Sequence, residues 1–236
     1  MENVVLNAFG LEGGYHGGRV LLGASFELRE GEVLGVIGRN GVGKTTLMRT
    51  LMGLLPLTAG RIVLNSVDIS GMKTHERAVI GMGYVPQGRE VFGGLTVEEN
   101  LRTGVLGHPR VRLDMHERVL SYFPILKQRL RQKAGTMSGG EQQQLAIGRA
   151  LVGAPKVLLL DEPSEGVQPS IVHAIAETLA AIAQELGIGV VLVEQDIAML
   201  QRAAQRCCVM EKGAIVDTLE RAQLSDAATM RRYLSI

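Results

Sequence analysis

The sequence predicts an α/β protein built on a parallel sheet, and three observations support this fold class. Residues 157–160 and 190–193 are wholly apolar, as expected of strands covered on both faces. Between them, apolar residues recur at helical spacing over 171–186, and Gly187 is placed to end that helix. A third apolar strand, 33–37, is followed by a glycine-rich turn and another helical pattern. Repeated strand, helix, strand units imply right-handed crossovers within one parallel sheet.

The composition predicts one folded unit without a strong electrostatic bias. The chain has 236 residues, of which 46% are hydrophobic and 21% charged, close to the averages for globular proteins. Lys and Arg total 25 against 24 Asp and Glu, which gives a formal net charge of +1. Because this balance provides no general attraction to polyanions, we expect no nucleic-acid partner and a local phosphate site.

The apolar runs, the N-terminus and the cysteines bear on where the chain resides. The longest apolar runs are far shorter than the roughly 20 residues that cross a bilayer. Residues 1–3 do not begin a basic region followed by an apolar stretch, so no secretory signal is visible. Adjacent Cys207 and Cys208 have a spacing that seldom forms a disulfide, and they are interpreted as buried strand residues. A cytoplasmic location is expected.

A phosphate-binding loop stands between the strand 33–37 and the helix that follows. Residues 38–45 read Gly-Arg-Asn-Gly-Val-Gly-Lys-Thr and match the pattern G-x-x-x-x-G-K-[ST]. The glycines let successive N–H groups point at phosphate oxygens, and the helix adds its positive N-terminal end. Lys44 is expected to bridge the β- and γ-phosphates of ATP, and Thr45 to offer its hydroxyl to Mg²⁺. The predicted nucleotide contacts here are Gly38, Asn40, Gly41, Gly43, Lys44, Thr45 and Thr46.

Two acidic residues, Asp161 and Glu162, follow the apolar strand 157–160. Asp161 stands where a carboxylate reaches Mg²⁺ directly or through water, and Glu162 is then placed to polarise the attacking water. Taken alone, the pair also fits a solvated strand end, but the phosphate loop upstream favours the catalytic interpretation. These features leave GTPases, helicases, kinases and transport ATPases open.

Residues 137–143, Met-Ser-Gly-Gly-Glu-Gln-Gln, separate these classes. Ser138 and Glu141 form the S-x-x-E pattern of a helix cap. Together with Gln87 after an expected strand, 81–85, this segment resembles the signature of ABC ATPases, and the resemblance extends over nearly the whole chain. It implies a P-loop (RecA-like) ABC ATPase core with an N-terminal antiparallel β-subdomain and an inserted helical subdomain. In this single domain, 1–236, the core would comprise 1–87 and 152–236, and the helical subdomain about 88–151.

The resemblance implies that the signature residues contact a nucleotide bound to a neighbouring subunit. In that family the signature of one subunit closes over the γ-phosphate bound to another, so Ser138, Gly139 and Gly140 are expected to complete a partner's ATP site. The chemistry is suitable, because a helix N-terminus with a free hydroxyl and two glycines is an anion site. Residues 164–166 resemble the D-loop that joins the two active sites.

Three further roles follow from the resemblance alone. Tyr15 is similar to the aromatic residue that stacks on adenine. Gln87 resembles the residue that links Mg²⁺ and the attacking water to the membrane subunits. Gln195 stands where most members have a His that contacts the γ-phosphate. An amide at that position still donates a hydrogen bond but does not titrate near neutral pH.

Several segments narrow the resemblance to importers of branched-chain amino acids and small amides. They are Glu-Gln at 194–195 and the segments 85–92, 95–101 and 163–169. Within this group, Pro-Gln-Gly-Arg-Glu and Glu-Gly-Val-Gln-Pro are more similar to the urea-type ATPase. Import of urea or a short-chain amide is therefore favoured, with branched-chain amino acids as the alternative. The short, near-neutral chain disfavours an ABC ATPase that acts on DNA or ribosomes. The signature segment disfavours a GTPase or kinase.

The resemblance also implies an assembly on the inner face of the cell membrane. Its expected members are two transmembrane permease subunits, a second ABC ATPase subunit and an extracytoplasmic substrate-binding protein. A heterodimer of ATPase subunits is expected, with a homodimer as the alternative for the isolated chain. The permease is expected to dock at 90–92 and the nearby helical insertion. Helices are also expected over 113–122 and in the tail, 219–236.

Overall fold

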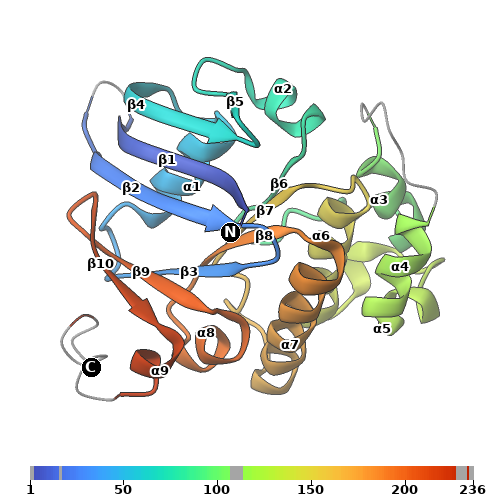
Figure 1. Ribbon diagram of the computed structural model, residues 1–236. Coiled ribbons are helices and arrows are strands. Elements are labelled where there is room, and N and C mark those ends of the chain that lie inside the picture. The colour runs from blue at the N-terminus through green and yellow to red at the C-terminus, as the bar shows by residue number, and fades with distance from the viewer. Residues whose placement is uncertain (1–2, 16–17, 107–113, 227–232, 234–236) are drawn as a thin grey trace.

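The computed structural model describes residues 3–15, 18–106, 114–226 and 233, which form two sheets and the helices that cover them (Figure 1). Leu113, Met230 and Leu234, which belong to two of the expected helices, lie outside the described residues. Among the described residues, no helix combines the length and apolarity needed to cross a membrane.

The larger sheet has six strands in the order β10-β9-β3-β8-β7-β6, and all neighbours are parallel except β10 and β9. Its central strands are the three apolar runs, and every residue of β3, β7 and β8 is buried. This burial explains why these strands lack the alternation of a half-exposed strand. The strands are β3 (Val33–Ile37), β6 (Met82–Val85), β7 (Val157–Asp161), β8 (Gly189–Val193), β9 (Arg206–Glu211) and β10 (Ala214–Glu220).

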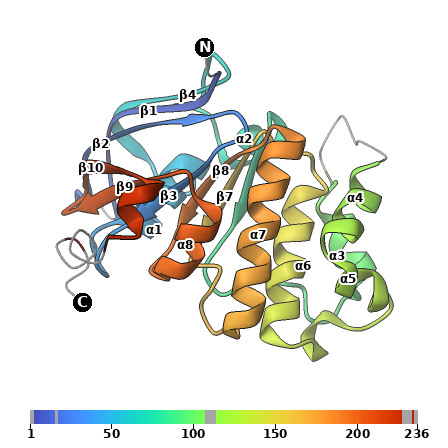
Figure 2. The ribbon, with the colours of Figure 1, turned by 60° about the horizontal axis from the view of Figure 1, so that its bottom comes forward.

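Each face of this sheet has its own hydrophobic core. On one face, Val33 and Ile37 join a cluster with residues of α6 (Gly139–Leu151), α7 (Pro169–Leu186) and α8 (Ile197–Ala203). On the other face, Leu34 and Val36 pack with α1 (Lys44–Met52) and the smaller sheet. Full burial of each Val, Leu or Ile side chain contributes about 1.5–3 kcal/mol, so the alternating sides of β3 hold both layers together. Figure 2 shows the helical layer, with α7 and α6 side by side.

The smaller sheet is antiparallel and has the order β2-β1-β4-β5. It comprises β1 (Val4–Gly13), β2 (Leu21–Arg29), β4 (Leu57–Leu64) and β5 (Val67–Asp68). Alternation in β2, where Ala24, Phe26 and Leu28 are buried between exposed residues, gives this sheet one core-facing side. The predicted combination of a parallel P-loop core with an N-terminal antiparallel sheet is confirmed.

Short helices between β6 and α6 lie on the side of α6 that faces away from α7 (Figure 2). They are α3 (Val97–Thr103), α4 (Met115–Tyr122), α5 (Pro124–Gln128) and the 3₁₀ helix η1 (Ala134–Thr136), while α2 (Thr74–Val79) precedes β6. Leu101, Val119 and Leu126 of this group are buried in the same cluster as α6. The division of the chain at 88 and 151 stays a prediction.

The C-terminal part differs from its expectation. β9 and β10 form a hairpin, and β10 continues to Glu220, so Leu219 belongs to a strand and not to the expected helix. A single helical turn, α9 (Arg221–Leu224), follows. Leu219 pairs with Cys207 in the register of the hairpin, and this long-range pairing overrides the apolar spacing that suggested a helix.

Candidate nucleotide-hydrolysis site

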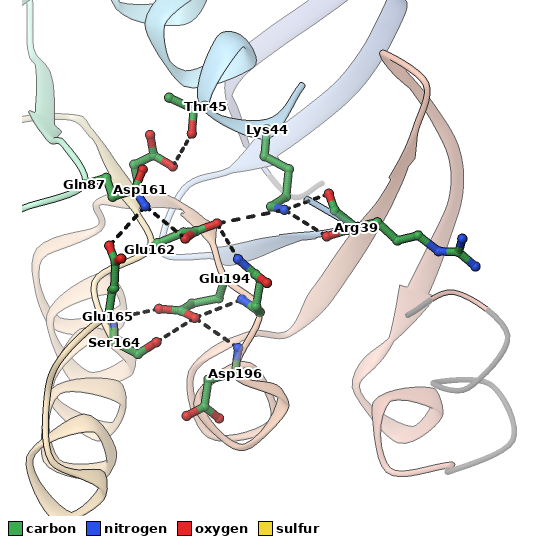
Figure 3. Close-up of polar contacts among 12 residues, drawn as sticks. Arg39, Lys44, Thr45, Gln87, Asp161, Glu162, Ser164, Glu165, Glu194 and Asp196 are labelled. Atoms are coloured by element: carbon green, nitrogen blue, oxygen red, sulfur yellow. Dashed lines mark hydrogen bonds and ion pairs between the residues drawn. The ribbon is translucent and has the colours of Figure 1, made fainter. Parts of the chain in front are cut away.

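The phosphate loop lies between β3 and α1 and encloses the side chain of Lys44. Gly43 is the N-cap of α1 with φ +112°, a left-handed conformation that favours glycine. Lys44 is 5% exposed, and its Nζ donates to the carbonyl oxygens of Gly38 at 2.8 Å and Arg39 at 3.1 Å (Figure 3). Burial lowers the pKa of Lys44, while the carboxylates of Glu162 and its neighbours oppose this change. The loop therefore presents a cation among carbonyl groups, in front of a helix N-terminus.

The carboxyl end of β7 places Asp161 beside this loop. Asp161 is 1% exposed, and its Oδ1 accepts a hydrogen bond from Thr45 Oγ1 at 3.3 Å. Its Oδ2 accepts from the Tyr84 hydroxyl at 3.4 Å. Burial raises the pKa of Asp161, and the Thr45 hydrogen bond opposes that shift. Proteins hold Mg²⁺ through few oxygen ligands plus substrate phosphates, so Thr45 and Asp161 together fit this ion.

Glu162 turns away from the strand and is held by two amides. Its φ of +49° is unusual for a residue with a side chain, and its N–H donates to the Val193 carbonyl at 2.9 Å. Gln195 Nε2 donates to Glu162 Oε1 at 2.8 Å, and Gln87 Nε2 donates to Oε2 at 3.4 Å. Oε1 also lies 3.9 Å from Lys44 Nζ. The carboxylate thus has a fixed position next to the phosphate loop, where it can orient and polarise a water molecule.

These groups surround one cavity of about 550 Å³. The cavity brings together most of the predicted site. Its groups follow the carboxyl ends of parallel strands, which lie at one edge of the sheet: the phosphate loop, Gln87, Glu162 and Gln195. Gly38 and Asp161 are not in its lining, but Gly38 contacts Lys44 and Asp161 contacts Thr45. The lining residues are Tyr15, Val20, Asn40, Gly41, Gly43, Lys44, Thr45, Thr46, Gln87, Glu162, Glu165 and Gln195.

Tyr15 lies at the rim of this cavity. It is 38% exposed, and its hydroxyl accepts a hydrogen bond from Arg49 Nη1 at 3.3 Å. An exposed ring beside a phosphate loop is available for stacking on a planar base. The predicted contact with adenine stays a prediction.

The signature residues lie apart from this cavity. Ser138, Gly139 and Gly140 are absent from its lining, and Ser138 is the N-cap of α6. The predicted capping box forms: Glu141 N–H donates to Ser138 Oγ at 3.4 Å, and Ser138 N–H donates to Glu141 Oε2 at 2.8 Å. The Ser138 hydroxyl oxygen accepts the capping bond, which is compatible with a contact to a partner's phosphate, and that contact stays a prediction. A Cβ on Gly140 would lie 2.6 Å from Ile171 Cδ1, so a larger residue there would have to displace the Ile171 side chain.

Two residues near the site are missing from the sequence predictions: Val20 in the lining and Tyr84 behind it. Glu165 and Glu194 appear there only within the segments 164–166 and 194–195, without a role of their own. Glu194 carried a usable signal, since it follows a buried strand as Asp161 and Glu162 do. Tyr84 was recognisable only as the polar side chain of an otherwise apolar strand. Val20 has no local pattern that separates it from other loop residues.

A buried lysine in a glycine loop, with an acid pair at the carboxyl end of another strand of the same sheet, defines a P-loop nucleotide hydrolase. The protein-family model for the ABC transporter matches residues 21–165. The chain belongs to the ATP-binding subunits of the ABC transporter family, and it is accordingly an ATPase.

Relatives of known designation agree with this family. The chain is 44% identical over 193 residues to the high-affinity branched-chain amino acid transport ATP-binding protein BraG of Pseudomonas aeruginosa, covering 81% of this chain and 82% of BraG. It is 34% identical over 202 residues to the probable branched-chain amino acid transport ATP-binding protein LivF of Archaeoglobus fulgidus, covering 85% and 84%. Its fold is similar to a nucleotide-free ATP-binding cassette from an ABC transporter, with TM-score 0.86, 25% identity and 99% coverage of both chains.

Proposed function

We propose that this chain hydrolyses ATP to drive import of branched-chain amino acids through a membrane ABC transporter. The observation that carries the ATPase site is the constellation of Lys44, Glu162 and Gln195 around one cavity. Similarity to BraG and LivF, both designated for branched-chain amino acids, supports the substrate class. This similarity favours branched-chain amino acids over urea or a short-chain amide.

Each group in the cavity has a proposed part in the reaction. Lys44 binds the β- and γ-phosphates, because it is the buried cation of the phosphate loop. Glu162 accepts a hydrogen bond from the attacking water and polarises it, while Gln195 holds Glu162 and donates to the γ-phosphate. Thr45 and Asp161, with Gln87, would hold Mg²⁺, which neutralises charge on the phosphates when bound.

Ser138, Gly139 and Gly140 serve the ATP of a second ATPase subunit in this proposal. Their position outside the chain's own cavity supports the assignment, as does the helix of 13 residues that begins there. The first N–H groups of such a helix have no partners within the helix and attract anions. A different ATPase subunit is the proposed partner in the transporter, and a second copy of this chain is the partner in isolation.

The proposed contact with the permease is an apolar groove between α1, β6 and the helices that follow. The groove has a volume of about 620 Å³, and its lining includes Leu54, Phe92 and Leu106. These three side chains are 50%, 52% and 74% exposed and line the same groove, and exposed apolar residues that cluster in this way are typical of an interaction site. Arg149 lies over the Phe92 ring with its Cζ 4.9 Å from the ring centroid, so one wall is fixed. Docking here would hold the chain at the inner face of the membrane, with the substrate-binding protein on the opposite side.

Urea or a short-chain amide is the second candidate substrate. It rests on the segments Pro-Gln-Gly-Arg-Glu (86–90) and Glu-Gly-Val-Gln-Pro (165–169). The experiment measures the ATPase rate of the transporter assembled in lipid vesicles. Its substrate-binding protein is added after loading with leucine or with urea. Stimulation by leucine alone supports the proposal. Stimulation by urea alone replaces it with the second candidate, and a response to neither overturns both.

A further inference from the structure

Glu194 is a buried acid beside the site for which the reaction above has no use. It follows β8 directly and is 1% exposed. Burial raises the pKa of Glu194, and hydrogen bonds from neighbouring N–H and O–H groups oppose that shift. A buried carboxylate without such bonds costs several kcal/mol, so its partners determine why it is tolerated.

Four hydrogen bonds converge on this carboxylate from two separate segments (Figure 3). Oε1 accepts from the Ser164 N–H at 2.7 Å, and Oε2 accepts from the Ser164 hydroxyl at 2.8 Å. Oε2 also accepts from the N–H groups of Gln195 at 2.9 Å and Asp196 at 3.1 Å. The carboxylate therefore joins the loop after β7 to the turn after β8.

Both joined segments lead to Glu162. Gln195 donates its side-chain amide to Glu162 Oε1, so its backbone position sets where that amide reaches. Ser164 begins the loop that contains Glu165, and Glu165 Oε2 accepts from Gln87 Nε2 at 3.0 Å. Gln87 is the other amide on Glu162. One buried group is thus connected to both side chains that hold the proposed base.

We infer that Glu194 is a positioning residue for hydrolysis, fixing Gln195 and the loop at Ser164 as one unit around Glu162. The inference rests on the proposed role of Glu162. Only an ionised carboxylate can accept all four bonds. The NH₂ group of a glutamine side chain is itself a donor and would face at least one of the four donors. Glu194 acts on the phosphate loop only through its charge, which opposes the lowering of the Lys44 pKa, and makes no hydrogen bond to the loop among the described contacts. The larger effect of a change at Glu194 is therefore expected in turnover rather than in ATP binding.

The test compares Glu194→Gln with Ser164→Ala in the assembled transporter. Glu194→Gln should lower kcat about 10-fold, since it loses one hydrogen bond to a charged group, with KM for ATP within about 3-fold of the parent. Ser164→Ala removes only the hydroxyl and should lower kcat by less. Because both act through one contact, the double variant should lose less than the product of the two single losses.

Glu32→Gln is the matched control, because Glu32, which directly precedes β3, is also a buried carboxylate at 6% exposure. Its Oε1 accepts a hydrogen bond from Arg206 Nε at 2.6 Å. This variant should lose thermal stability without a change in kcat below its melting temperature. Unchanged kcat in both Glu194→Gln and Ser164→Ala would overturn the inference, as would equal losses in the Glu32 variant. If Glu194→Gln does not fold, Ser164→Ala and its KM-against-kcat split decide alone.

A parallel Glu162→Gln measurement separates this inference from the proposed function. An inactive Glu162→Gln with a fully active Glu194→Gln removes the positioning role only. An active Glu162→Gln removes the proposed base and the positioning role with it.

Discussion

The phosphate loop and the signature segment are both glycine-containing turns that begin a helix, yet they present different anion sites. Helix α1 begins at Gly43 with no side-chain cap and no acidic residue in its first turn. Helix α6 begins at Ser138 with a complete capping box, and Glu141 lies in its first turn. The first helix leaves its N-terminal end to a ligand in its own cavity. The second helix end is stabilised by its own cap and, in our proposal, contacts the phosphate of an ATP that is bound to another subunit.

The largest effect should come from Lys44→Ala, which breaks the phosphate-loop side of this comparison. The variant removes the buried cation that would contact two phosphates, so affinity for ATP should fall about 1,000-fold. Equilibrium binding of a fluorescent ATP analogue measures the loss. Lys127→Ala, at an exposed position on α5, is the control and should bind normally. Near-parental affinity of Lys44→Ala would contradict the assignment.

Glu162→Gln should separate binding from chemistry on the same side. Loss of a general base lowers turnover typically by 10²–10⁴-fold, so we expect a decrease of about 1,000-fold with ATP affinity preserved. The trapped ATP state should then accumulate as a dimer, which gel filtration with multi-angle light scattering detects. Full turnover in the assembled transporter would exclude Glu162 as the base.

Ser138→Arg tests the signature side. A long cation at this turn should occupy the space of the partner's nucleotide and weaken ATP-dependent dimerisation about 100-fold, while the isolated chain still binds ATP. Introducing the change into Glu162→Gln allows dimers to be counted without turnover. Ser121→Arg, at an exposed position of α4, serves as the control. Weaker ATP binding by the isolated Ser138→Arg chain would place the signature in the chain's own site.

The smallest effect is expected at Gln195. Gln195→Ala removes one hydrogen bond to a charged group, about 1.5–3 kcal/mol, and should slow turnover about 10- to 200-fold. Gln195→His should stay active and alone gain a titration near pH 6.5 in its pH–rate profile, because imidazole ionises in that range. Profiles of kcat from pH 5.5 to 9 compare the variants. A fully active Gln195→Ala would show that this amide contributes nothing to the transition state.

Contiguous segments determined much of the fold and of the proposed site. The apolar runs of β3, β7 and β8 required burial on both faces, and Gly187 ends α7 in a left-handed conformation. The loop 38–45 carries its own glycines and lysine, so its shape follows from residues adjacent in sequence. The capping box of Ser138 and Glu141 is likewise local.

Only the tertiary structure decided which distant groups meet. Because β7 lies between β8 and β6 in the sheet, the segments after these three strands converge. That order brings Gln195 and Gln87 to Glu162, and it joins Ser164 to Glu194 across 30 positions of sequence. Hydrogen bonds of this range depend on which strands lie next to each other, and the apolar pattern of one strand does not specify its neighbours. The sequence by itself therefore determined the elements and the phosphate loop, while packing determined the environment of the carboxylate.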